Sequence, residues 1–299
     1  MYLDHYGLKE KPFSITPNPR FIYLSKNHKE VFAHLLYGVR DQAGFIVVTG
    51  EVGTGKTTVL RTLLGELQEA QYCLAFIFNP SVSALDLLRN INREFGIDAE
   101  GSNNSDLIRV LNDFLLQMRG EGRTVVLVID EAQNLEPSVL EQIRLLSNLE
   151  TDTDKLIQII LVGQPELNQV LQRDDLRQLN QRITVRYHLQ PMDFGDTCDY
   201  IAHRLRIAGG TTQKVFTDGA LKKIFSFSRG YPRLINILAD RALLVGFAEG
   251  CREVNVRMVR TAIKETGHQV QRFSQRSLAW WGGGGLVAAA VALGVYLLT

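Results

Sequence analysis

A glycine-rich loop between an apolar run and a helical stretch constrains this chain more than any other feature. Residues 45–49 have the β-branched and aromatic composition of a buried strand, and a helix is predicted to begin at Lys56. The spacing from Gly50 to Thr57 fits the pattern G-x-x-x-x-G-K-S/T of a phosphate-binding loop. The residues expected to contact a nucleotide are Gly50, Glu51, Val52, Gly53, Thr54, Gly55, Lys56, Thr57 and Thr58.

The residue types of this loop suit the chemistry of a triphosphate. Glycines let the backbone curl so that its N–H groups point at phosphate oxygens, and the following helix N-terminus adds partial positive charge. Lys56 is expected to reach the β- and γ-phosphates, and Thr57 to bind Mg²⁺ through its hydroxyl. The alternative is a glycine turn that only joins a strand to a helix, but the strand, loop and helix context favours the phosphate-binding loop.

A second apolar run, residues 125–129, ends in two carboxylates, Asp130 and Glu131. A continuous β-branched run is typical of a strand buried on both faces of a parallel sheet, and ligands bind at the carboxyl ends of such strands. Asp130 is expected to hold Mg²⁺ directly or through water, and Glu131 to act as the general base on the attacking water. A solvated acidic turn is the alternative, which the upstream phosphate-binding loop disfavours.

Strand and helix patterns alternate through the first 190 residues. Further strands are predicted at about 73–78, 156–162 and 184–188, and helices at about 27–40, 56–68, 84–95, 105–119 and 137–150. This alternation predicts a mostly parallel three-layer α/β domain over residues 25–190. Gln164 follows the strand at 156–162, so it is expected to hydrogen-bond the γ-phosphate or the attacking water; a plain turn glutamine is the alternative.

The segments on either side of this domain have different patterns. Three prolines within the first 20 residues predict an extended arm over residues 1–24 rather than a helix. Phe21 and Tyr23 in this arm are interpreted either as stacking on an adenine ring or as core packing. Residues 191–267 are predicted to be helical, with helices at 194–207, 218–226, 232–248 and 255–266.

The last apolar segment matches a membrane span. Residues 278–298 carry no charged side chain, are about 20 residues long, and begin near a Trp-Trp pair of the kind found at membrane interfaces. The linker 268–277 contains Arg272 and Arg276, and nothing basic follows the span, so the positive-inside rule places the preceding domains in the cytoplasm. A buried C-terminal helix or a linker is the alternative.

Overall charge and cysteine content bear on the partners and the cellular compartment of this protein. A formal net charge of +1 gives no electrostatic case for a nucleic-acid partner. Three widely separated cysteines argue against a disulfide framework or a zinc site and suit a reducing compartment.

Taken together, the ordered motifs resemble the AAA+ ATPases, and within them the general secretion pathway protein A (ExeA-like) group, which includes the ATPase of mannose-sensitive haemagglutinin pilus biogenesis. The resemblance covers nearly the whole chain before the predicted span. It is carried by Tyr6-Gly7-Leu8, Pro12-Phe13, Pro17-Asn18-Pro19, Gly50–Thr58, Asp130-Glu131-Ala132-Gln133, Gly163-Gln164-Pro165, Gln181-Arg182-Ile183 and Gly230-Tyr231-Pro232-Arg233.

This resemblance implies roles for residues outside the two central motifs. Gln164 is implied to occupy the sensor-1 position, where generic AAA+ proteins prefer Asn, Ser or Thr. Arg182 is implied to be the arginine finger that reaches the γ-phosphate bound by a neighbouring subunit, with Arg177 as the second candidate. Arg233 is implied to be sensor 2, projecting from a helical lid onto the phosphates. An arginine supplied in trans makes hydrolysis depend on a homo-oligomer.

The function implied by the resemblance is that of an ATP hydrolase using ATP and Mg²⁺. A single span would hold it in the inner membrane with the ATPase domain in the cytoplasm, where it would help secretion or pilus components assemble. Two other interpretations stay open. One is a DNA-associated AAA+ ATPase of the transposition or helicase-loader type, which the neutral charge and the span disfavour. The other is a nucleotide-gated scaffold that acts through binding rather than turnover.

Overall fold

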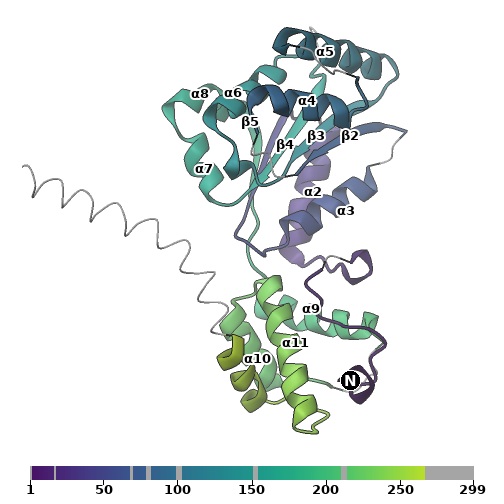
Figure 1. Cartoon of the computed structure of the whole chain (residues 1–299), viewed down its shortest axis with the longest axis vertical. Coiled ribbons are helices and arrows are strands. Elements are labelled where there is room, and N and C mark those ends of the chain that lie inside the picture. The colour runs from purple at the N-terminus through teal and green to yellow at the C-terminus, as the bar shows by residue number, and fades with distance from the viewer. Residues whose placement is uncertain are drawn as a thin grey trace, which may run out of the picture. The chain divides into compact units, whose positions relative to one another are not determined.

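The computed structural model describes residues 2–16, 18–67, 70–78, 82–98, 103–150, 154–209 and 214–266 (Figure 1). The chain forms two compact units, each of which is described by itself. One unit comprises Ile22–Met192, and the other joins Met1–Phe21 to the chain from Asp193 onward. The predicted membrane span at 278–298 lies outside the described residues, and none of the helices within them is long and apolar enough to cross a membrane.

The larger unit is built on a five-stranded sheet with the strand order β2-β3-β4-β1-β5 (Figure 1). Every neighbouring pair is parallel, which confirms the predicted three-layer α/β fold. The strands are β1 (Phe45–Thr49), β2 (Tyr72–Ile77), β3 (Thr124–Ile129), β4 (Ile157–Gly163) and β5 (Ile183–His188). Because β1, β4 and β3 are adjacent and parallel, the segments that follow them start at one edge of the sheet.

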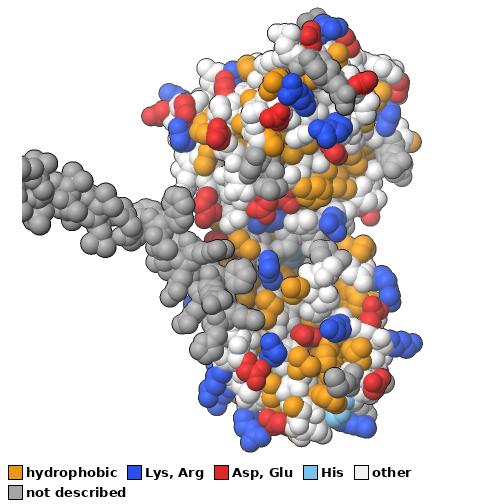
Figure 2. Space-filling view, in the orientation of Figure 1, with side chains coloured by type: hydrophobic (Ala, Val, Ile, Leu, Met, Phe, Trp, Pro, Cys, Tyr) orange, Lys and Arg blue, Asp and Glu red, His pale blue; other side chains and the backbone are white. Residues whose placement is uncertain are grey.

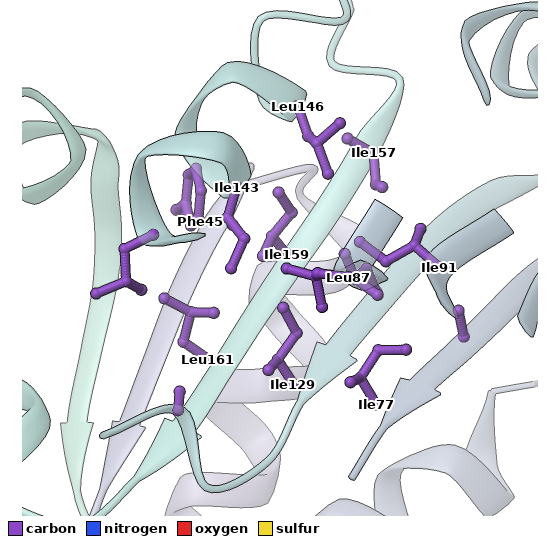
Figure 3. Packing of buried hydrophobic residues seen from close by; sticks show 14 of the residues in the cluster. Phe45, Ile77, Leu87, Ile91, Ile129, Ile143, Leu146, Ile157, Ile159 and Leu161 are labelled. Atoms are coloured by element: carbon purple, nitrogen blue, oxygen red, sulfur yellow. The ribbon is translucent and has the colours of Figure 1, made fainter. Parts of the chain in front are cut away.

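Helices cover both faces of this sheet. They are α2 (Lys26–Arg40), α3 (Lys56–Glu66), α4 (Ala84–Glu94), α5 (Asn104–Gly120), α6 (Pro137–Leu146), α7 (Glu166–Leu171) and α8 (Arg177–Arg182). Alternate strand residues face opposite layers, as the period of a strand requires. Ile46 and Val48 pack in one cluster with α2 and α3. Figure 3 shows part of the other cluster, where Ile159 and Leu161 of β4 lie among residues from α4 and α6.

Two details of this unit differ from the sequence prediction. Helix α6 ends at Leu146 rather than near residue 150, because Ser147 caps it and its hydroxyl donates to the Arg144 carbonyl oxygen at 2.7 Å. The short helices α7 and α8 were not predicted, since six residues are too few for a helical period to stand out.

The smaller unit is helical, as the pattern predicted. It contains α9 (Phe194–Ile207), α10 (Asp218–Ser228), α11 (Pro232–Ala248) and a helical stretch at residues 256–266. The N-terminal segment contributes the one-turn helix α1 (Tyr2–His5) and the 3-10 turn η1 (Pro19–Phe21) to the same unit.

The N-terminal segment departs from the extended arm that its prolines predicted. Its first turn is helical because the prolines begin only at Pro12, and it is held on α11 by hydrogen bonds from the Tyr2 hydroxyl to Asp240 Oδ1 (2.6 Å) and from the Tyr6 hydroxyl to the Leu243 carbonyl oxygen (3.2 Å). Phe21 is buried, and the guanidinium of Arg204 lies 5.0 Å from its ring centroid. This contact supports the core-packing interpretation of Phe21.

Candidate active site

The loop after β1 has the backbone conformation of an anion-binding loop. Gly53 and Gly55 have φ angles of 82° and 103°, which side-chain-bearing residues rarely adopt. Gly55 precedes the first turn of α3. Among the described residues, none accepts a hydrogen bond from the backbone N–H of Gly53, Gly55 or Lys56. Unpaired N–H groups at a helix N-terminus are a ready site for a phosphate.

Lys56 folds back over this loop. The residue is 7% exposed, and its Nζ donates to the carbonyl oxygens of Gly50 (2.7 Å) and Glu51 (3.1 Å). Burial lowers the pKa of the ammonium group, and the carboxylates of Glu131 and Asp130 oppose that shift. The site thus holds a partly desolvated cation at the loop whose N–H groups can bind a phosphate.

Thr57 and Asp130 form the pair expected for magnesium. The Thr57 hydroxyl donates to Asp130 Oδ2 at 3.2 Å, and the Glu131 N–H donates to Asp130 Oδ1 at 2.9 Å. Burial raises the pKa of the Asp130 carboxyl. Within the described parts of the chain, no cluster of three or more His, Cys, Asp or Glu is suited to hold a metal by itself. Mg²⁺ typically uses one or two side chains together with substrate phosphates, so this pair fits a magnesium nucleotide.

Glu131 is held in place by two glutamines. Gln133 Nε2 donates to Glu131 Oε2 at 2.6 Å, and Gln164 Nε2 approaches the same oxygen at 3.3 Å. The Gln164 backbone N–H in turn donates to Gln133 Oε1 at 3.0 Å. Glu131 has a φ of 54°, a left-handed conformation whose strain is typical of functional sites. The structure therefore joins the predicted base to the predicted sensor both directly and through Gln133.

Comparison with known proteins identifies the class to which this site belongs. Residues 39–171 match the AAA domain family model, and that range includes the loop, Asp130, Glu131 and Gln164. General secretion pathway protein A of Aeromonas hydrophila is 46% identical over 294 residues, which are 98% of this chain and 52% of that protein. The chain is an AAA+ protein related to general secretion pathway protein A. It spans about half the length of that relative.

Solved structures of other proteins show the same fold. Cdc6p from Pyrobaculum aerophilum superposes with a TM-score of 0.62 at 20% identity, covering 85% of this chain and 70% of that one. The ADP form of ORC2 from Aeropyrum pernix gives 0.65 at 17% identity, with coverage of 86% and 73%. The RuvB branch migration motor of Thermotoga maritima gives 0.54 at 18% identity, with coverage of 80% and 68%. Identities this low establish the fold alone.

The three predicted arginines are carried by helices α8 and α11. Arg182 ends α8, and its Nη1 donates to Ser147 Oγ at 2.5 Å. Arg177 begins the same helix and is exposed. Arg233 lies in the first turn of α11, in the helical unit of this AAA+ protein. The contacts implied for all three, across a subunit boundary or from the lid, stay predictions.

Two residues of the site were missed from the sequence. Gln133 was recognised only as part of a motif, and its link to Gln164 depends on β3 and β4 being neighbours. His28 is 1% exposed and lies against the phosphate-binding loop, with its Nε2 at 2.8 Å from the Thr54 carbonyl oxygen. Its one local signal is Ser25, the helix N-cap three residues earlier, whose Oγ lies 2.5 Å from His28 Nδ1.

Proposed function

We propose that this AAA+ protein hydrolyses ATP to ADP and phosphate with Mg²⁺. The observation that carries this activity is that a phosphate-binding loop, a buried lysine, a hydroxyl–carboxylate pair and an oriented glutamate meet at one edge of the sheet. These groups are Lys56, Thr57, Asp130 and Glu131, and they lie in the segments that follow β1 and β3. This set corresponds to the parts that phosphoryl transfer requires.

Each side chain has a distinct task in this reaction. The loop N–H groups and Lys56 bind the phosphate chain, and Thr57 with Asp130 would hold Mg²⁺, which neutralises phosphate charge when bound. Glu131 accepts a proton from the attacking water while Gln164 orients that water. The water oxygen bonds to the γ-phosphorus, the bond to the β–γ bridging oxygen breaks, and ADP leaves with the released electron pair.

Phosphate release from the purified chain, compared with a Glu131→Gln variant, tests the catalytic assignment. Loss of a general base typically lowers turnover by roughly 10²- to 10⁴-fold, so we expect a decrease of that order with ATP affinity retained. Lys56→Ala is the matched binding-deficient control. Equal turnover by the chain and by Glu131→Gln would remove the assignment of Glu131.

The same two variants separate an ATPase from a nucleotide-gated scaffold. Turnover drives the process if both Lys56→Ala and Glu131→Gln abolish function in cells. Binding alone suffices if Glu131→Gln preserves function while Lys56→Ala abolishes it.

We further propose that Arg182 completes the site of a neighbouring subunit in a homo-oligomer. An arginine supplied in trans typically contributes about 10³- to 10⁵-fold to turnover, so Arg182→Ala should be nearly inactive and Arg177→Ala should not. Mixing Arg182→Ala with Lys56→Ala supplies an intact loop from one subunit and an intact arginine from the other. Regained activity in the mixture, rising with protein concentration, supports the finger, whereas an inactive mixture rules against it.

We propose that Arg233 senses the nucleotide from the lid, and that the movement helps a secretion or pilus machine assemble at the inner membrane. The name of the relative and the predicted span at 278–298 support this role. Expressed in a bacterium, the chain should fractionate with inner membranes and resist extraction at alkaline pH. Full release by alkaline extraction would contradict a single-pass anchor.

Nucleic acid is not expected among the partners of this protein. The formal net charge is +1, and basic and acidic side chains are interspersed over the face shown in Figure 2. Salt-dependent binding of DNA by the purified chain would instead favour the transposition or helicase-loader type.

A further inference from the structure

We propose that His28 is a positioning residue that aims the backbone of the phosphate-binding loop at the nucleotide. This role rests on the proposed nucleotide binding and adds to it a residue from outside both nucleotide motifs. His28 lies in the first turn of α2, 26 residues before Thr54, and its ring is almost completely buried against the loop.

The contact with Thr54 sets the direction of the next N–H group. Within a planar trans peptide the carbonyl oxygen and the following N–H point in opposite directions. The Thr54 carbonyl oxygen is held at 2.8 Å from His28 Nε2, so the Gly55 N–H points away from the imidazole. None of the described residues accepts a hydrogen bond from that N–H. His28 therefore keeps a phosphate-binding donor turned outward before the nucleotide arrives.

The carbonyl partner also defines the role of Nε2. A carbonyl oxygen only accepts, so Nε2 carries the hydrogen that it donates to Thr54. Nδ1 lies 2.5 Å from Ser25 Oγ, and this oxygen caps α2 by accepting from the His28 N–H at 3.4 Å. The ring thus bridges the N-terminus of α2 to the loop.

The space beside the loop fits an imidazole closely. A Cβ atom added to Gly55 would lie 2.5 Å from His28 Nε2, so the ring fills the volume that a side chain at position 55 would take. Gly55 also has a φ of 103°, a backbone conformation that residues with a side chain rarely adopt. The absence of a side chain at Gly55 thus leaves the space that the His28 ring occupies.

Two substitutions separate positioning from simple packing. His28→Gln places an amide donor near the position of Nε2, whereas His28→Asn places its amide near the position of Nδ1, out of reach of Thr54. Both variants are polar, and each forfeits either the contact to Ser25 or the contact to Thr54, so their thermal unfolding midpoints should be similar. The replacement His34→Asn is the matched control, since His34 is an exposed residue on the same helix.

The readout is the affinity for ADP, measured by calorimetry on the full chain. Misaligning one hydrogen bond to a charged group weakens binding by about tenfold or more, so His28→Asn should lose at least that much ADP affinity. His28→Gln and His34→Asn should stay within about threefold of the wild-type chain, a difference of about 0.7 kcal/mol. Because the N–H contacts the phosphate chain before and during the reaction, KM for ATP should rise in His28→Asn while kcat changes little.

Two results would overturn this role. One is a folded His28→Asn variant that binds ADP as the wild-type chain does, and the other is a His28→Gln variant that loses affinity. If His28→Asn does not fold, His28→Gln alone decides, since retained affinity supports the role and lost affinity rejects it. Failure of the proposed function is a different outcome, in which the wild-type chain itself binds no ADP.

Discussion

Gln133 offers the sharpest test of how the site is organised. It donates to Glu131 Oε2 at 2.6 Å and accepts the backbone N–H of Gln164 at 3.0 Å, so it fixes the general base relative to the residue expected to orient the water. A hydrogen bond to a charged group contributes about 1.5–3 kcal/mol, and that energy corresponds to roughly a 10- to 150-fold change in rate. We therefore expect Gln133→Ala to lower kcat by this factor and to leave KM for ATP unchanged.

Gly163→Ala should disturb the same contact from the opposite side. A Cβ at position 163 would lie 2.8 Å from Gln133 Oε1 and 3.1 Å from Leu167 Cδ2, so the glutamine amide must move away. The amide is the far end of a flexible side chain, and moving it breaks its bonds to Glu131 and Gln164 with little cost to the fold. We expect kcat to fall by about tenfold, the size of one lost charge-assisted hydrogen bond.

A double-mutant cycle with steady-state phosphate release is the assay. If Gly163→Ala acts through Gln133, it should change kcat less than about threefold in the Gln133→Ala background, since the interaction is already absent. Gly65→Ala is the control, because a Cβ there meets nothing within 4 Å. The coupling would be refuted if the double variant lost kcat by the product of the two single fold-changes, or if Gln133→Ala had wild-type kcat.

Three further predictions concern charge, packing and backbone strain. Burial raises the pKa of Asp130 above its ordinary value of 3.8. Between these two pKa values the folded chain keeps a proton that the unfolded chain loses, so the free energy of unfolding falls as pH rises. Asp130→Asn should remove this pH dependence when urea unfolding is measured at a series of pH values. Arg204 donates to the carbonyl oxygens of Pro12 and Ser14. Arg204→Ala should therefore lower the free energy of unfolding by about 3 kcal/mol and expose the N-terminal segment to protease. Arg206 is exposed, so Arg206→Ala should change the free energy of unfolding by less than about 0.5 kcal/mol. Gly55→Ala forces a side chain into a φ of 103°, so it should cost at least about 1 kcal/mol of stability in the same unfolding assay and abolish ADP binding in calorimetry.

The parts of the site that sequence predicts are those encoded by short continuous spacing. Lys56 and Thr57 are fixed by the glycine spacing of one loop, and Asp130 and Glu131 follow directly from a buried strand. The contact between Thr57 and Asp130 needs only the rule that parallel strands end at one edge of a sheet. These residues and the three-layer fold were therefore within reach of pattern and chemistry alone.

The parts that sequence does not predict depend on which strands and helices become neighbours. Gln133 meets Gln164 because β3 lies beside β4, and a pattern along one strand carries no information about its neighbour. His28 was not predicted because helical periodicity identifies apolar faces, whereas the role of this polar ring depends on its contact with the phosphate-binding loop. The first turn at Tyr2–His5 was missed because its stability comes from contacts with α11 rather than from local propensity.

A calorimetric titration of the purified chain with a non-hydrolysable ATP analogue, with Mg²⁺ or with chelator, tests the central claim most directly. We expect one nucleotide to bind per chain, with affinity that falls when Mg²⁺ is removed and is lost in Lys56→Ala. A folded chain that takes up no nucleotide in the presence of Mg²⁺ would contradict the assignment of this site.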